Sequence, residues 1–149
     1  MAYLILTHNN SVTLLAKKME ELEKQVPAYV QYQNGLAGKI LTISDEEFSK
    51  LQSGQKFTVE NNTLNFSQEY QGSLFETEKT MQDVISKIIE RIDQIYPKYK
   101  DISFGNELTA YKAVLTSFDT STFTYPYNQS IEKHLLDQGT PVVSTLQMV

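Results

Sequence analysis

Three residue types that can take part in catalysis lie close together near the C-terminus: Ser130, Lys133 and His134. Ser-x-x-Lys is a nucleophile motif of penicillin-binding proteins and class A β-lactamases. Those enzymes also need S-D-N and K-T-G elements, which this sequence does not contain. The same stretch fits a short helix, with Ser130 as the N-cap, Glu132 in the first turn and Gly139 as the stop. We therefore interpret Ser130 as a capping residue and not as a nucleophile.

His134 could act as a general base if Glu132 or Asp137 oriented its ring. On a helix, positions two apart point in different directions, so only Asp137 could share a face with His134. A lone histidine in a polar helical turn is usually a surface residue, which is the interpretation we adopt. His8 follows the first apolar run and lies in the sequence His-Asn-Asn, which favours a turn. We interpret His8 as a surface residue too.

The remaining candidates for chemistry also have structural explanations. Asp45, Glu46 and Glu47 fit the first turn of a helix, where acidic residues favour the positive end of the dipole. Gly35-x-x-Gly38 matches the clamp of KH domains, but Lys39 is the only basic residue beside it, so the match is uninformative. The chain has no cysteine and two distant histidines, which argues against thiolate and His-rich metal sites. We expect no catalytic residue, no cofactor and no metal site.

The charge and hydropathy of the chain argue against two classes of partner, nucleic acids and membranes. The net charge is −5 and Arg91 is the only arginine, so we expect no binding to nucleic acid. No apolar run approaches the length of about twenty residues that spans a bilayer, so we expect no membrane partner. The apolar run Tyr3–Leu6 is too short for a signal peptide, which predicts synthesis and folding in a cytoplasm.

The pattern of apolar residues predicts an α+β protein, with a small β-rich lobe over residues 1–72. Residues 2–7 predict a strand. Residues 11–15 are either its return strand or the start of a helix capped by Ser11, and a helical pattern follows over 16–25 until Pro27 ends it. Residues 28–33 and 38–43 predict further strands.

Two local signals in this lobe are clearer. Ser44 and Glu47 have the spacing of a capping box, which predicts the start of a helix, and Gly54 should end it. Phe48 and Leu51 of this helix should face inward. The segment KFTVE-NN-TLNF then predicts a β-hairpin, because Asn61-Asn62 tolerates positive φ at the tip.

Residues 73–149 predict a mainly helical lobe that forms one compact unit with the first. Apolar residues from Met81 to Ile95 recur at helical spacing, and Pro97 should end this helix. Its broad apolar face should pack on both a partner helix and the first lobe; a coiled-coil seam is the alternative. A second helix at about 106–118 should return antiparallel, followed by an irregular aromatic stretch and a short helix at about 131–138.

Two segments are candidates for contacts with other proteins. Tyrosine offers rigid amphipathic contact area, and an apolar chain end needs a surface to bury against. The C-terminal tail, TPVVSTLQMV, could close the chain's own helical hairpin or enter a groove on a neighbouring subunit. The predicted interaction residues are Phe123, Tyr125, Tyr127, Val142, Val143, Leu146, Met148 and Val149.

The chain begins with the sequence YLIL, Tyr3–Leu6, followed by Asn9 and Asn10, and it ends with a short helix, a glycine stop and Leu146-Gln147. Both chain ends resemble small proteins encoded by T4-like cyanophages and related tailed phages. The layout is also similar to that of phage tail-fibre assembly chaperones, with Tyr111 and Leu115 as a Y-x-x-x-L motif. The chain lacks the Trp-Pro or Phe-Pro segment common in those chaperones. At the C-terminal end the matching residues are Ser130, Glu132, Leu135, Asp137, Gly139, Leu146 and Gln147.

This resemblance implies a role in virion structure or assembly rather than a reaction. It implies a non-catalytic structural protein of the tail or fibre apparatus, located in the virion after synthesis in the host cytoplasm. The implied partners are other phage structural proteins, or further copies of the chain. The alternatives are a tail-fibre assembly chaperone and a small-molecule-binding or enzymatic early protein active in counter-defence.

Overall fold

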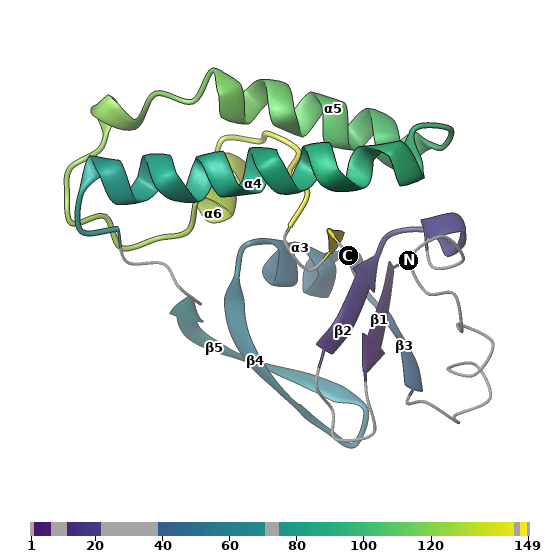
Figure 1. Cartoon of the computed structure of the whole chain (residues 1–149). Coiled ribbons are helices and arrows are strands. Elements are labelled where there is room, and N and C mark those ends of the chain that lie inside the picture. The colour runs from purple at the N-terminus through teal and green to yellow at the C-terminus, as the bar shows by residue number, and fades with distance from the viewer. Residues whose placement is uncertain (1, 7–11, 22–38, 71–74, 145–146, 149) are drawn as a thin grey trace.

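The protein is an α+β fold in which strands occupy the N-terminal part and helices the C-terminal part (Figure 1). The computed structural model describes residues 2–6, 12–21, 39–70, 75–144 and 147–148. The predictions that fall on His8, on residues 28–33 and on Gly35-x-x-Gly38 lie outside the described residues. So do Leu146 and Val149 of the predicted interaction set. In the described part of the chain, no helix is both long and apolar enough to cross a bilayer.

The first three strands form one antiparallel sheet in the order β2-β1-β3. They span Ala2–Leu6 (β1), Val12–Ala16 (β2) and Lys39–Ile43 (β3). The ambiguous segment after residue 10 is therefore the return strand of a hairpin, since Leu4 lies opposite Leu15 and Tyr3 opposite Ala16. The continuous apolar sequence of β1 agrees with its burial, because Leu4, Ile5 and Leu6 are all fully buried although their side chains point to alternate faces of the sheet. Residues 19–21, which follow β2, are helical, and the last part of the predicted helix, residues 22–25, lies outside the described residues.

Helix α3, Asp45–Gln52, begins at the predicted capping box, with both reciprocal bonds between Ser44 and Glu47 present. Phe48 and Leu51 are buried against the first sheet, as predicted. The strands Gln55–Glu60 (β4) and Thr63–Tyr70 (β5) then form the predicted hairpin. Its tip residues have φ values of 51° and 62°, the left-handed conformation that asparagine tolerates.

The long helix α4 spans Glu78–Tyr99, so the prediction that Pro97 ends it is wrong by two residues. Proline removes one backbone donor, but it does not stop a helix whose next residues are held by packing. Tyr99 is fully buried, and its ring meets Phe104 edge-on at 4.9 Å between centroids. This contact keeps the last turn of α4 helical.

Helix α5, Ser103–Thr116, runs back beside α4 as the predicted antiparallel hairpin (Figure 1). It begins three residues earlier than we predicted from the sequence. The reason is that Ile102 occupies the N-cap position and makes no side-chain capping bond, so the sequence carries no start signal there. Leu108, Tyr111 and Leu115 are buried against α4, as their spacing predicted.

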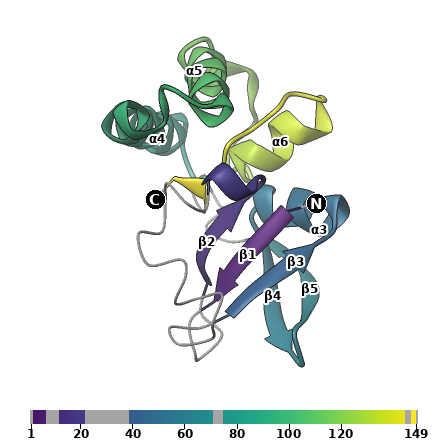
Figure 2. The ribbon, with the colours of Figure 1, turned by 90° about the vertical axis from the view of Figure 1, so that its right-hand side faces the viewer.

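The C-terminal elements lie between the helical hairpin and the strands (Figure 2). A short 3-10 turn, Thr120–Thr122 (η1), precedes helix α6, Ile131–Asp137. Side chains of α4, α5, α6 and the C-terminal segment share one apolar cluster, whereas the strands and α3 form a second cluster that contains no α4 residue. Among the described residues, α4 therefore shares no apolar cluster with the first lobe, contrary to the prediction that it packs there. Its second neighbours are α6 and the C-terminal segment, and Arg91 Nε of α4 donates to Met148 O at 3.2 Å.

Polar contacts join the two parts. Lys17 pairs with Glu107 of α5 at 3.2 Å. Gln52 Nε2 of α3 donates to Val142 O at 2.8 Å. The boundary between residues 72 and 73 stays a prediction, and these contacts agree with a single packed unit.

Candidate functional site: an aromatic pocket beside helix α6

Ser130, the first candidate nucleophile, has a structural role. Its Oγ accepts the backbone N–H of Lys133 at 3.0 Å, which caps α6. The same hydroxyl donates to Ser53 O, at the end of α3, at 2.6 Å. Both positions are buried, so this hydroxyl is used twice inside the fold. Gly139 has a φ of 77° and ends α6 as predicted.

Lys133 and His134 do not form a catalytic pair with Ser130. The Lys133 ammonium group forms an ion pair with the Asp137 carboxylate on the next turn. Asp137 is therefore paired with Lys133 and does not orient the His134 ring. The His134 side chain is half-buried, which corrects our interpretation of it as a surface residue. Its ring meets the edge or face of Phe123, at 4.7 Å between centroids, and of Phe118, at 5.9 Å.

The aromatic rings around His134 come from the segment between α5 and α6. Phe118 and Phe123 are stacked at 5.4 Å with an interplanar angle of 15°. Tyr127 meets Phe123 at 4.7 Å between ring centroids. The backbone of Tyr127 also exchanges two hydrogen bonds of 2.8 Å with Phe75, just before α4. The sequence indicated the aromatic segment, with Phe123 and Tyr127, but not that His134 would join these rings, because only the packing of α6 brings His134 to them.

Further hydrogen bonds fix the shape of this segment. Asp119 caps the 3-10 turn by accepting the Ser121 N–H at 3.0 Å. The Tyr125 hydroxyl donates to Thr120 O at 2.6 Å. The Thr120 hydroxyl in turn donates to the Glu78 carboxylate, at the start of α4, at 3.2 Å. The aromatic rings are therefore presented by a well-supported loop rather than by a loose one.

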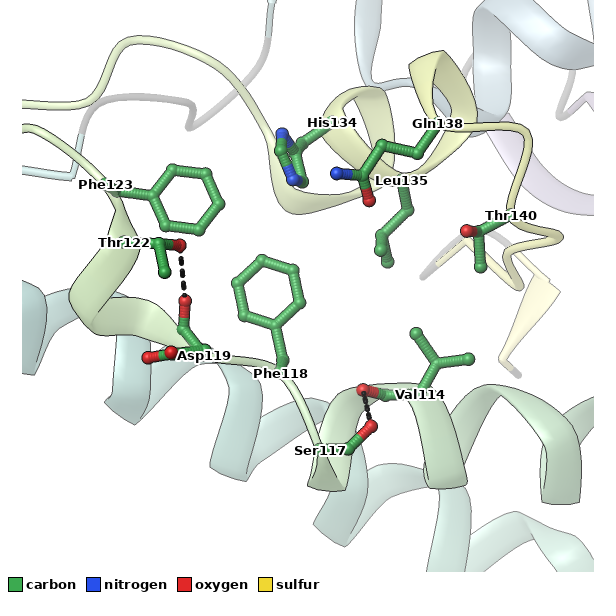
Figure 3. A pocket seen from close by; sticks show the side chains of 10 residues that line it. All are labelled: Val114, Ser117, Phe118, Asp119, Thr122, Phe123, His134, Leu135, Gln138 and Thr140. Atoms are coloured by element: carbon green, nitrogen blue, oxygen red, sulfur yellow. Dashed lines mark hydrogen bonds between the residues drawn. The ribbon is translucent and has the colours of Figure 1, made fainter.

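These elements enclose a pocket of about 320 Å³ between the end of α5, the loop and α6. Figure 3 shows the Phe118 ring inside it, with His134 of α6 and Gln138, the C-cap residue of α6, on the facing wall. The Gln138 amide and the Thr140 hydroxyl supply uncharged hydrogen-bonding groups, and Val114 and Leu135 supply apolar surface. Such a lining suits an inserted side chain that is partly apolar and partly polar.

One charged residue, Asp119, belongs to the lining of this pocket, and its side chain is exposed. Hydrogen bonds from the Ser121 hydroxyl, and then from its backbone N–H, lower the pKa of Asp119. Burial, and then the Asp137 carboxylate, raise the pKa of the Tyr127 hydroxyl. Asp119 is therefore ionised and Tyr127 neutral near pH 7, and neither is tuned toward proton transfer at that pH.

The predicted interaction residues separate into two groups. Phe123, Tyr125 and Tyr127 lie in or next to the aromatic pocket and are half-buried. Val142, Val143 and Met148 are instead buried, at 6%, 3% and 4% exposure, in the chain's own helical cluster. The prediction that these three offer a contact surface is thereby corrected. The helical hairpin and α6 leave an apolar face that the tail covers within the same chain.

Other candidate residues also have local roles. Glu47 completes the capping box of α3, and Asp45 and Glu46 lie in its first turn, as predicted. In the described part of the chain, no group of three or more histidine and acidic side chains is placed to hold a metal ion. Sequence analysis missed one buried acidic residue, Glu21, which follows β2 and carries no motif.

Comparison with known proteins gives no family for this chain. No protein family model, no curated protein and no solved structure matches it significantly.

Proposed function

We propose that this chain is a non-catalytic protein that acts through protein–protein contacts. The observation that carries the proposal is the aromatic pocket beside α6, where half-buried rings, uncharged polar groups and the exposed carboxylate of Asp119 line an open space. Protein interfaces are enriched in aromatic residues at their centre, and energetic anchors fill such pockets. The occupant we propose is a side chain of another protein.

The roles of the candidate nucleophile and base support this proposal. Ser130 Oγ is occupied by the cap of α6 and by Ser53 O. His134 packs among aromatic rings and has no orienting carboxylate among the described residues, because Asp137 is paired with Lys133. A triad needs a base that is oriented by a third group and directed at its nucleophile, and this arrangement provides neither.

The resemblance of the two chain ends supports a more specific proposal: a structural protein of the tail or fibre apparatus of a bacteriophage virion. We expect mass spectrometry of purified particles to find the chain in stoichiometric amounts. Its absence from particles would contradict a structural role. Co-purification with a fibre protein from infected cells, combined with absence from particles, would favour the assembly chaperone instead.

The role of the pocket can be tested separately by substitution. Phe123→Ala should leave the fold intact, because Phe123 is only half-buried, but should reduce incorporation into particles at least tenfold. Phe57→Ala is the matched control, since Phe57 is a half-buried phenylalanine of the β4–β5 hairpin, away from the pocket. Equal incorporation of the two variants would contradict the assignment of the contact to this pocket.

A further inference from the structure

A second pocket, of about 390 Å³, lies where the first lobe, α5 and the C-terminal segment meet. Its lining residues come from three segments far apart in the sequence: Lys17 follows β2, Asn106, Glu107 and Ala110 belong to α5, and Pro141, Val142 and Val143 follow α6. None of them lines the aromatic pocket beside α6. The two pockets are therefore separate sites.

Most side chains that line this second pocket are apolar. Ala110, Pro141, Val142 and Val143 contribute hydrocarbon side chains, and the stem of Lys17 adds further methylene groups. The volume of the pocket lies at the small end of the range in which proteins bind small molecules. A ligand that fills it therefore has a small apolar body.

The two charged residues of the lining are paired with each other. Lys17 Nζ donates to Glu107 Oε1 at 3.2 Å, so one positive and one negative charge lie side by side. An anionic head group on a ligand would be repelled by Glu107, and a cationic one by Lys17. A neutral ligand avoids both repulsions.

This ion pair keeps hydrogen-bonding capacity of both kinds. Glu107 Oε2 is a buried acceptor without a partner among the described residues. The Glu107 side chain as a whole is 35% exposed, and rotation about its last bond exchanges the two carboxylate oxygens. The Lys17 ammonium group can donate hydrogen bonds beyond the one to Glu107. A hydroxyl group matches the pair, because it donates one hydrogen bond and accepts another.

We propose that this second pocket binds a small neutral molecule that has an apolar body and one hydroxyl group. The hydroxyl group donates to Glu107 and accepts from Lys17, and the apolar body lies against Ala110, Val142 and Val143. Because these residues belong to both lobes and to the C-terminal segment, the ligand also stabilises their junction. At a free ligand concentration of about ten times the Kd, the folding equilibrium constant should rise roughly elevenfold.

The first experiment titrates the full chain with p-cresol and follows the methyl groups by NMR. The methyl signals of Ala110, Val142 and Val143 should shift. Toluene, which lacks the hydroxyl group, should bind about tenfold more weakly. The anion p-toluate should also bind more weakly than p-cresol. Absence of p-cresol binding would overturn the proposal, and so would equal or tighter binding of toluene or p-toluate.

The second experiment tests the location of the ligand with two alanines of α5. Ala110→Phe should fill the pocket and abolish the binding of p-cresol. Ala113→Phe is the matched control, because Ala113 is also an exposed alanine of α5 but does not line the pocket, so binding should not change. Undiminished binding by Ala110→Phe would place the ligand elsewhere and overturn the proposal.

The third experiment tests the hydroxyl contact without changing the volume of the pocket. Glu107→Met keeps the length of the side chain but removes the acceptor. The wild type should prefer p-cresol to toluene, and Glu107→Met should lose most of this preference. An unchanged preference in Glu107→Met would overturn the role of Glu107 in the proposed site.

Discussion

Ser130 joins two helices through one hydroxyl group, which caps α6 and donates to the carbonyl oxygen of Ser53, the C-cap residue of α3. Ser130→Ala should destabilise the protein by about 1–2 kcal/mol, because it removes the cap and leaves the buried Ser53 carbonyl group unpaired. Urea denaturation at pH 7 measures this loss. Ser117→Ala is the control: its exposed hydroxyl bonds only within its own helix, so the change should stay within about 0.5 kcal/mol.

Tyr111 presents the opposite case, a hydroxyl group that is buried without a partner. Burial, and then the Glu132 carboxylate, raise the pKa of this hydroxyl, so it stays neutral and acts as an unsatisfied donor. Tyr111→Phe should therefore leave stability unchanged or raise it by up to about 1 kcal/mol.

Tyr125→Phe provides the matched comparison for Tyr111→Phe. The Tyr125 hydroxyl donates to Thr120 O at 2.6 Å, so its removal should destabilise the protein by about 1 kcal/mol. In thermal unfolding, the changes in melting temperature of the two variants relative to the wild type should differ in sign or clearly in size. A loss of stability in Tyr111→Phe equal to that in Tyr125→Phe would mean that Tyr111 has a partner after all.

At the scale of elements, the connection between α4 and α5 depends on Gly105. A Cβ atom at this position would lie 2.3 Å from the backbone oxygen of Tyr99, which is far inside van der Waals contact. Gly105→Ala should therefore destabilise the protein by about 3 kcal/mol through forced separation of the two helices. Differential scanning calorimetry measures the loss.

Gly139→Ala is the control for this close approach. Gly139 has a φ of 77°, but no atom lies within 4 Å of an added Cβ. Only the left-handed backbone is then disfavoured, by about 1 kcal/mol. If the two glycine variants lose equal stability, the close packing at Gly105 is not what positions the hairpin.

The elements also differ in how well their sequences predicted them. Helix α3 and the β4–β5 hairpin were predicted closely, because a capping box and an Asn-Asn turn act through neighbouring residues. The end of α4 and the start of α5 were not, because Tyr99 and Phe104 fix them by packing on each other. The residue types at Pro97 and Ile102 give no indication in the sequence of the contact between Tyr99 and Phe104.

At the scale of the whole molecule, the C-terminal segment completes the core. Val142, Val143 and Met148 are buried in the helical cluster, and Gln52 of α3 donates to Val142 O. Deletion of residues 140–149 should therefore abolish cooperative unfolding, as followed by circular dichroism. A deletion variant that stays soluble and folded but no longer assembles would show instead that the tail docks on a neighbouring subunit.

Single substitutions give a milder version of this test. Val143→Ala should destabilise the protein by about 2 kcal/mol through lost burial and a residual cavity. Pro141→Ala is the control, because Pro141 is exposed and precedes the buried pair, and its effect should stay within about 0.5 kcal/mol. Urea denaturation of both variants checks the difference.

The sequence by itself determined the α+β class, the order of most described elements and the local roles of Ser130 and Gly139. Helix caps, turns and helical periodicity depend on residues a few positions apart, so they can be predicted from a single sequence. The tertiary structure alone decided which side chains meet across the fold. Lys17 reaches Glu107 over a separation of 90 residues, and His134 meets rings of a separate loop. Those contacts depend on how whole elements pack, and no local pattern of residue types encodes that packing.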